Sequence, residues 1–433
     1  MELMIVYRFL RKISDWTLSG FYSEVCITGG ENVPRDGPVI IAATHHNEII
    51  DIAALSATIS YRRRVCYWAK SSLFKNPISG ALLTSSGSIP VYRNPNSSSS
   101  PFPSNSNSLQ ANLFRHTSAA LAAGKVIGVF PEGTSYTEPR IVQVKDGAAW
   151  AAVGEGKELV IVPAAVVYTD KSKYGKPIGV GEYAARLDPE SAESTRFVVK
   201  EITAAIDSQL KHMTVNAPDW KTLRAACAAR RVFWKNEDRI PLDRFVGISQ
   251  KFVDALLPRS DEMETRKTIL NRYLALLHFT GTSHSALEVL YPFVDHSEDF
   301  LMRPLLWPSR IRTGVTLLFQ LCTTMFHPRA LLFFPVFVVH IPGYITGWFA
   351  ARMLTIPNEE ETKAQFKAIF GGLGFAISYG LLTRACVKQG LLNRALGTLA
   401  MAVGMTWSLW KWHNALVVLT TASLFNVLAP CEN

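Results

Sequence analysis

The chain has 433 residues, 48% of them hydrophobic, and a formal net charge of +10. Its length exceeds that of one ordinary compact domain, so we expect two parts. A positive charge of this size suits nucleic acid, an anionic membrane surface or an acidic substrate. The sequence has no zinc-knuckle spacing, no RNP-type strand and no long basic run, which makes nucleic acid the weakest of these partners.

The first 34 residues have a short apolar beginning. The stretch from Met1 to Lys12 is interrupted by Arg8 and Arg11, so it is a poor signal peptide. We interpret residues 1–34 as an amphipathic segment that lies on a membrane.

Residues 35–235 alternate between short apolar runs and helical apolar spacing, which predicts an α/β layer architecture. Strands are expected at 39–43, 65–69, 87–92, 126–130 and 159–168, and helices at 49–59, 73–85, 109–123, 147–153 and 197–213. Residues 94–108 are rich in Ser, Asn and Pro and are expected to form a disordered surface insertion.

The C-terminal part is more apolar. We expect a helical linker over 236–310 and a helical transmembrane region over 311–433. The run from Ala330 to Ala351 has no acidic or basic residue and can cross a hydrocarbon core of roughly 30 Å. Further candidate spans are 313–326, 368–383, 395–410 and 415–428, so a multi-pass membrane protein is expected. A buried soluble helical domain is the alternative, because His340 and Lys411 are unfavourable in lipid.

The six cysteines are scattered and form no C-x-x-C pair. This pattern indicates reduced thiols and argues against a disulfide framework or a zinc site. We expect no metal and no cofactor.

A histidine and an aspartate, His46 and Asp51, stand five positions apart where a predicted strand gives way to a helix. On one continuous helix their side chains would be turned roughly 140° apart, so His46 should lie in the loop and Asp51 in the first helical turn. A carboxylate on one imidazole nitrogen leaves the other nitrogen to remove a proton from a hydroxyl. Adjacent His45 has Ile50 at the matching distance, which favours His46 as the base. Alone, this spacing is common by chance, and a loop histidine without catalytic function is the alternative.

Two further sequence blocks favour the catalytic interpretation of this histidine. The segments Gly87–Arg93 and Phe130–Ser135 each end a predicted strand, and Pro163 lies within another. Ligands of open α/β sheets bind beyond the carboxyl ends of the strands, so these blocks should meet on one side. The ordered set, with Trp68–Phe74, resembles the PlsC-type glycerolipid acyltransferase family.

This resemblance implies a mixed sheet flanked by helices and direct transfer from acyl-CoA, a co-substrate, to a hydroxyl deprotonated by His46 with Asp51. It also implies that certain residues bind the phosphorylated acceptor: Arg93, Glu132, Gly133, Thr134 and, with less weight, Lys70. Lys145 and Arg140 are weaker candidates like Lys70, for phosphate or CoA, with ordinary solvated charges as the alternative for all three. Glu132 is assigned to acceptor hydroxyls or to a basic neighbour, with a loop-stabilising acid as the alternative. Ser135 and Thr44 depart from the residues frequent in the family.

The segment Met213–Leu223, with Arg230 and Arg231 after it, resembles the fungal glycerol-3-phosphate/dihydroxyacetone-phosphate acyltransferases of the endoplasmic reticulum. This implies acylation of the sn-1 hydroxyl of glycerol 3-phosphate or dihydroxyacetone phosphate at a lipid bilayer, the first step of phospholipid and triacylglycerol synthesis. A lysophosphatidate acyltransferase is the close alternative. A non-catalytic scaffold is a remote one, because it has no need for an imidazole–carboxylate pair.

Overall fold

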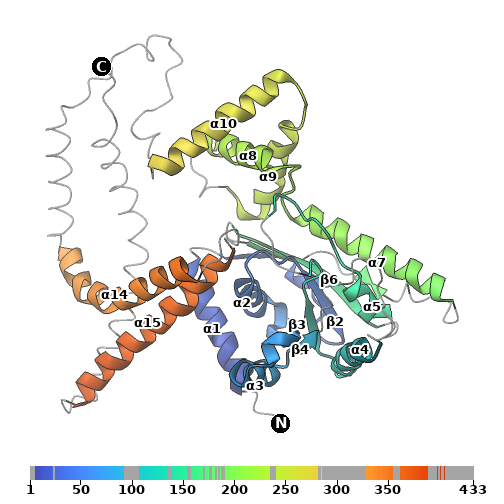
Figure 1. Ribbon diagram of the computed structural model, residues 1–433, viewed down its shortest axis with the longest axis horizontal. Coiled ribbons are helices and arrows are strands. Elements are labelled where there is room, and N and C mark those ends of the chain that lie inside the picture. The colour runs from blue at the N-terminus through green and yellow to red at the C-terminus, as the bar shows by residue number, and fades with distance from the viewer. Residues whose placement is uncertain are drawn as a thin grey trace. The chain divides into compact units, whose positions relative to one another are not determined.

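The computed structural model (Figure 1) describes most of the chain. The described residues are 5–22, 25–91, 107–133, 138–153, 158–168, 171–174, 178–180, 191–234, 240–280, 328–354 and 361–388, with single residues 183, 186, 284, 397, 400 and 404. The chain divides into two compact units. The first comprises Met1–Asp219, Pro241–Gln250 and Ile356–Gln365, and the second comprises Trp220–Ile240, Lys251–Thr355 and Phe366–Asn433.

The first unit is built on a mixed sheet. Its described strands are β1 (Cys26–Thr28), β2 (Val39–Ala43), β3 (Val65–Lys70), β4 (Ile89–Val91), β5 (Val126–Val129), β6 (Val160–Val167), β7 (Lys171–Tyr174) and β8 (Ile178–Gly179). The strand order is β1-β7-β6-β2-β5-β3-β4, with β8 also beside β6. Strands β6, β2, β5, β3 and β4 run parallel, whereas β7 and β8 are antiparallel to β6. The expected mixed α/β sheet is confirmed.

Helices cover both faces of this sheet (Figure 1). They are α1 (Ile5–Phe21), α2 (Ile49–Thr58), α3 (Pro77–Ser86), α4 (Asn107–Ala122), α5 (Gly147–Val153) and α7 (Ala192–Met213), with short 3-10 turns η1 (Gly30–Asn32), η2 (Ser60–Arg62), η3 (Ser71–Phe74) and η5 (Leu242–Arg244). Alternate residues of β2 point to opposite faces. Ile40 joins an apolar cluster with residues of α4, α5 and α7, whereas Ile41 joins a second one with residues of α1 and α2. A central parallel strand is therefore buried on both sides, which explains its unbroken apolar run.

The boundaries of several elements differ from the predicted ones: α7 begins at Ala192 instead of residue 197, and β4 covers only Ile89–Val91 of the strand predicted at 87–92. The helix expected at 73–85 is divided into η3 and α3, and Pro77 opens α3, a position where proline is tolerated. Of the expected insertion at 94–108, residues 94–106 lie outside the described residues, and Asn107 opens α4.

One side of helix α1 packs against the rest of the first unit, and the other side is exposed. The guanidinium of Arg11 donates to the carbonyl oxygen of Arg62 at 2.6 Å, and Leu18 is buried in the core. The exposed apolar side chains are Ile5, Phe9, Ile13 and Trp16. The expected amphipathic character is present, and contact of this face with a membrane stays a prediction.

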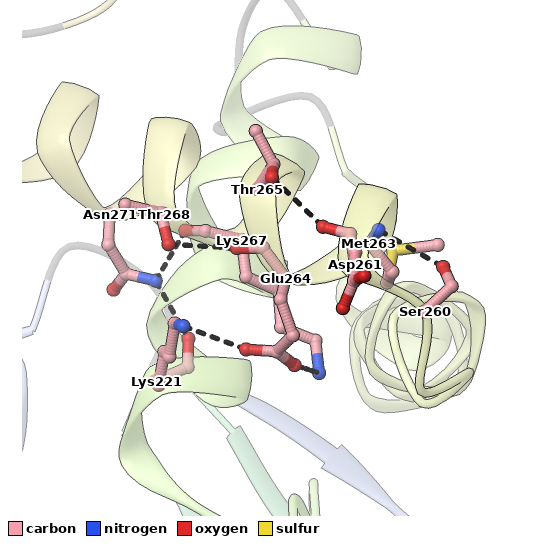
Figure 2. Close-up of polar contacts among 9 residues, drawn as sticks. All are labelled: Lys221, Ser260, Asp261, Met263, Glu264, Thr265, Lys267, Thr268 and Asn271. Carbon is pink, nitrogen blue, oxygen red and sulfur yellow. Dashed lines mark hydrogen bonds and ion pairs between the residues drawn. The ribbon is translucent and has the colours of Figure 1, made fainter.

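The second unit contains α8 (Trp220–Phe233), α10 (Asp261–Thr280) and the C-terminal part of α9 (Phe245–Ala255). Figure 2 shows how the start of α8 is tied to α10. Lys221 Nζ binds Glu264 Oε2 at 2.7 Å, and Asn271 Nδ2 donates to the carbonyl oxygen of Lys221 at 2.9 Å. Helices were expected here, and the rest of the predicted linker, apart from His284, lies outside the described residues after Thr280.

Helices α14 (Pro328–Met353) and α15 (Glu361–Lys388) pack closely through glycines. A Cβ added at Gly374 would lie 2.7 Å from Cα of Gly343, and one added at Gly347 would lie 3.3 Å from Cα of Gly371. Buried His340 shares a hydrogen bond of 2.8 Å with the hydroxyl of Tyr379. Large apolar side chains instead face outward, among them Ile345, Trp348, Phe349, Ile369, Leu373, Ile377 and Leu381.

The membrane predictions meet these helices only in part. Among the described residues, the segment Gln365–Ala385, with mean hydropathy 1.3, is the one helix long and apolar enough to cross a membrane. The run Ala330–Ala351 is helical as part of α14. Residues 313–326 and 415–428 lie outside the described residues, as does nearly all of 395–410, so the described part of the chain does not support a multi-pass topology.

Candidate active site

The site starts with a histidine–aspartate pair beyond the carboxyl end of β2. His45 lies in the loop after this strand, and Asp51 lies in the first turn of α2. Nδ1 of His45 is 2.9 Å from Oδ2 of Asp51. A loop histidine facing a first-turn aspartate is the expected geometry.

The structure pairs Asp51 with the adjacent histidine, whereas the prediction named His46 as its partner. Asp51 binds His45, and no hydrogen bond or ion pair joins it to His46 within the described residues. The reason is local: the backbone N–H of Asn47 donates to the same Oδ2 at 2.8 Å. The loop therefore wraps around the carboxylate and brings His45 to it. Position counting cannot choose between adjacent loop histidines.

Asp51 is fully buried, and its two oxygens have different partners. Oδ2 accepts from His45 and Asn47, whereas Oδ1 accepts from the hydroxyl of Tyr168. Burial of this hydroxyl, followed by the negative charge of Asp51, raises the pKa of Tyr168 well above its ordinary value. Sequence reasoning missed Tyr168, although its place directly after β6, at the ligand-binding edge of the sheet, was a usable signal.

Glu132, which follows β5, is a second fully buried carboxylate. Its Oε1 accepts from the backbone N–H of His45 at 2.7 Å, and its Oε2 has no hydrogen-bond partner among the described residues. The side chain of Gln143 donates to the Glu132 carbonyl oxygen at 3.2 Å. Glu132 thus supports a loop, as the alternative interpretation held, but the loop belongs to the neighbouring strand β2.

An aromatic stack supports the imidazole. The ring centroid of Phe130 lies 4.1 Å from that of His45 at an interplanar angle of 18°, and the ring of Tyr67 stacks with Phe130 at a centroid distance of 6.1 Å. His45 is thereby held by a carboxylate on its ring, a carboxylate on its backbone and an aromatic face.

The turn after Glu132 requires a glycine. Gly133 has φ of +82°, a conformation that L side chains rarely adopt. An added Cβ there would also lie 2.6 Å from Nζ of Lys145. The backbone N–H of Lys145 donates to the carbonyl oxygen of Pro131 at 2.7 Å, so this exposed lysine lies against the turn.

The remaining predicted binding residues are only partly placed. Lys70 ends β3 and is exposed. Arg93 and Thr134 lie outside the described residues. Within the described part, the blocks after β2, β5 and β6 come together at the carboxyl edge of the sheet, as expected.

The segment Met213–Leu223, which resembles the fungal subgroup, binds the loop that follows the Glu132–Gly133 turn. Asn216 Oδ1 accepts from the backbone N–H of Ile141 at 3.1 Å, and Ala217 N donates to the carbonyl oxygen of Pro139 at 2.9 Å. These bonds fix the loop that carries Gln143 and Lys145.

The chain is similar to known acyltransferases. Residues 24–167 match the Acyltransferase family model. The chain is 31% identical over 141 residues to glycerol-3-phosphate O-acyltransferase 2 of Saccharomyces cerevisiae, covering 29% of this chain and 18% of that protein. It is 26% identical over 245 residues to glycerol-3-phosphate O-acyltransferase 1 of the same yeast, covering 52% and 30%. It is also 25% identical over 167 residues to the chloroplastic 1-acyl-sn-glycerol-3-phosphate acyltransferase LPAT1 of Arabidopsis thaliana, covering 38% and 42%.

The matched stretches span less than a third of either yeast protein. The residues that match the family model contain the His45–Asp51 pair and the Phe130–Gly133 turn. Residues 24–167 of this chain are an acyltransferase domain of the PlsC type, the family that the sequence motifs resemble.

Proposed function

We propose that this protein transfers a fatty acyl group from acyl-CoA to the sn-1 hydroxyl of glycerol 3-phosphate or dihydroxyacetone phosphate. The observation that carries the proposal is the His45–Asp51 pair, 2.9 Å apart, at the carboxyl edge of the sheet beside the Glu132–Gly133 turn. The choice of acceptor rests on the two yeast relatives, which are named glycerol-3-phosphate O-acyltransferases.

His45 is the general base in this proposal, in place of His46. An ionised Asp51 only accepts hydrogen bonds, so Nδ1 of His45 carries its proton and Nε2 is left for the acceptor. The side chain of His45 keeps 16% of its surface exposed, so a substrate can reach it. Nε2 takes the hydroxyl proton while the oxygen attacks the thioester carbonyl, and Asp51 stabilises the resulting imidazolium. Collapse of the tetrahedral intermediate breaks the C–S bond, and the leaving thiolate recovers the proton from His45.

The acceptor phosphate is assigned to basic side chains at the same edge. Arg93 is the proposed bidentate partner, with Lys70 at the end of β3 and Thr134 in the turn. Lys145 lies against Gly133 and adds positive charge beside this turn. Glu132 has one oxygen on the His45 backbone, and its buried Oε2 can accept a hydrogen bond from an acceptor hydroxyl.

Membrane attachment is part of the proposal. Helix α15 contains the described segment that can cross a bilayer, and the outward apolar side chains of α14 and α15 suit lipid. A long-chain acyl donor is also suited to a site at a membrane. Placement in the endoplasmic reticulum follows only from the resemblance to the fungal subgroup.

A lysophosphatidate acyltransferase is the second candidate function. It is favoured by the Arabidopsis relative, whose name is that of a 1-acyl-sn-glycerol-3-phosphate acyltransferase. Both reactions use the same base and the same phosphate-binding chemistry, so the acceptor must be tested directly.

The test measures acyl transfer from a labelled long-chain acyl-CoA by the detergent-purified full chain. Wild type, His45→Ala and His46→Ala are each given glycerol 3-phosphate, dihydroxyacetone phosphate and lysophosphatidate. We expect wild type to acylate one of the first two, and His45→Ala to lose roughly 10²- to 10⁴-fold in kcat. His46→Ala should keep most of its activity. Activity with lysophosphatidate alone would transfer the assignment to the second candidate, and loss in His46→Ala alone would restore His46 as the base.

A further inference from the structure

Tyr168 stands directly after β6 and binds the side of Asp51 that faces away from the histidine. Its hydroxyl donates to Oδ1, whereas His45 occupies Oδ2. We propose that Tyr168 is a positioning residue of this site, which fixes the orientation of Asp51 and takes up part of its negative charge. This inference rests on the proposed function, in which His45 is the base.

The burial of Asp51 makes its donors important. A carboxylate removed from water needs hydrogen bonds to remain charged, and Asp51 is fully buried. Among the described residues, Tyr168 is the donor that Oδ1 has, and Asn47 N shares Oδ2 with His45. Without the phenol hydroxyl, one oxygen of a buried carboxylate would lose its partner.

The environment of Tyr168 keeps the hydroxyl a donor. Its ring packs at the edge of the apolar cluster on the α1–α2 face of the sheet, 6.0 Å from the ring of Tyr22. Because burial and the charge of Asp51 raise the pKa of Tyr168, the hydroxyl keeps its proton throughout the neutral range. It therefore always presents a hydrogen to Asp51.

The chemical consequence falls on His45. A carboxylate that gives part of its charge to a phenol attracts the imidazolium less strongly. Loss of the hydroxyl would leave more negative charge on the carboxylate that faces His45 and would favour the protonated imidazole. His45 would then be protonated, and inactive as a base, up to a higher pH.

Other titratable groups surround this pair and must be kept constant. Glu132 binds the backbone of His45 from the β5 side, and Tyr22 lies next to Tyr168. His46 and Glu48 belong to the same loop. None of them is altered by a Tyr168→Phe substitution, which removes one oxygen atom and preserves the ring.

The test compares wild type with Tyr168→Phe by two measurements. The first is an NMR titration of ring-labelled histidine in the full chain, with the His45 signal assigned through His45→Ala. The second is the pH dependence of kcat/KM. We expect the variant to show a higher His45 pKa and an acidic limb moved to higher pH. At neutral pH, kcat should fall roughly 10- to 100-fold, as for loss of one hydrogen bond to a charged group, with little change in the acceptor KM.

Tyr379→Phe is the matched control. It also removes a phenol hydroxyl, which shares a hydrogen bond of 2.8 Å with His340 instead of binding Asp51. It should lower the melting temperature without moving the His45 titration. A double-mutant cycle adds a second check: in an Asp51→Asn background, Tyr168→Phe should cost little more activity.

The outcomes separate this inference from the proposed function. Normal turnover in wild type with an unchanged His45 titration in Tyr168→Phe would overturn the inference alone. Absence of turnover with all three acceptors would overturn the proposed function, and the NMR titration would still decide whether Tyr168 controls the protonation of His45.

Discussion

The sheet of the first unit and the α14–α15 pair of the second bury polar groups in opposite ways. The sheet has apolar clusters on both faces, and its buried acids, Asp51 and Glu132, lie at the carboxyl edge, where each binds the His45 loop. In the helix pair, His340 and the glycines lie between the helices, whereas large apolar side chains such as Trp348 are 59% exposed.

This difference follows from the solvent that each region is suited to. In water, burial of apolar surface drives packing, and polar groups are buried where they find hydrogen-bond partners. In lipid that driving force is absent, and helices associate through small residues and hydrogen bonds. The first region thus buries its acids at the edge of a sheet, and the second has the arrangement expected of helices in a hydrocarbon phase, where its contact with lipid stays a prediction.

The largest effect is expected from a substitution of Asp51, a buried acid of the first unit. Asp51→Asn keeps the size of the side chain but presents an amide to His45, which disfavours the required tautomer and the imidazolium. We expect kcat to fall on the order of 10³- to 10⁴-fold, with a cooperative melting transition retained. Kinetics and circular dichroism of the purified protein measure both.

Asp207→Asn is the control for this substitution. Asp207 is an acid of α7 that pairs with Lys211 at the surface, and its loss should leave turnover near the wild-type value. Equal turnover in wild type and Asp51→Asn would show that the buried acid at this edge has no catalytic function.

The second prediction concerns the packing of α14 against α15. A Cβ at Gly374 would approach the backbone of α14, at 2.7 Å from Cα of Gly343 and 3.0 Å from the carbonyl oxygen of Pro342. Gly374→Leu should therefore destabilise the packed pair by about 1–3 kcal/mol or more. Thermal unfolding in detergent, followed by size-exclusion chromatography, measures the change.

The matched control is Gly380→Leu, on the same helix. A Cβ at Gly380 meets nothing within 4 Å, so this variant should melt close to wild type. Equal destabilisation by both substitutions would mean that the helices do not depend on close contact at Gly374.

Much of the first unit was predictable from local sequence. The apolar run of β2 and the helix α5 lie at the predicted residues, because burial on both faces and helical spacing leave plain local patterns. The meeting of the blocks at one edge was also predictable, since parallel strands end on the same side.

The site details that were missed depend on contacts across the fold. Glu132 binds a backbone N–H that lies 87 positions away, and Tyr168 binds Asp51 across 117. No local pattern encodes such pairs. Which of His45 and His46 pairs with Asp51 is not encoded locally for a different reason, because the path of an irregular loop decides which side chain faces α2.

The smallest expected effect concerns an exposed acid, which sharpens the contrast with Asp51. Hydrogen bonds from Lys221 and then Lys267 lower the pKa of Glu264 to about 2 (Figure 2). Because the folded-state pKa lies below the ordinary value of 4.5, the stabilisation is present at neutral pH and is lost as the pH falls from about 4.5 towards 2. Glu264→Gln should lower the melting temperature at pH 7 by no more than about 2 °C, since exposed ion pairs contribute little.

Wild type and Glu264→Gln should melt at the same temperature near pH 2, and added salt should reduce the difference between their melting temperatures at pH 7. Glu262→Gln, which removes only the ion pair with Arg266 within α10, is the control for the loss of one negative charge. A large decrease in the melting temperature of Glu264→Gln that does not depend on salt would show that this exposed acid stabilises the fold as strongly as a buried one does.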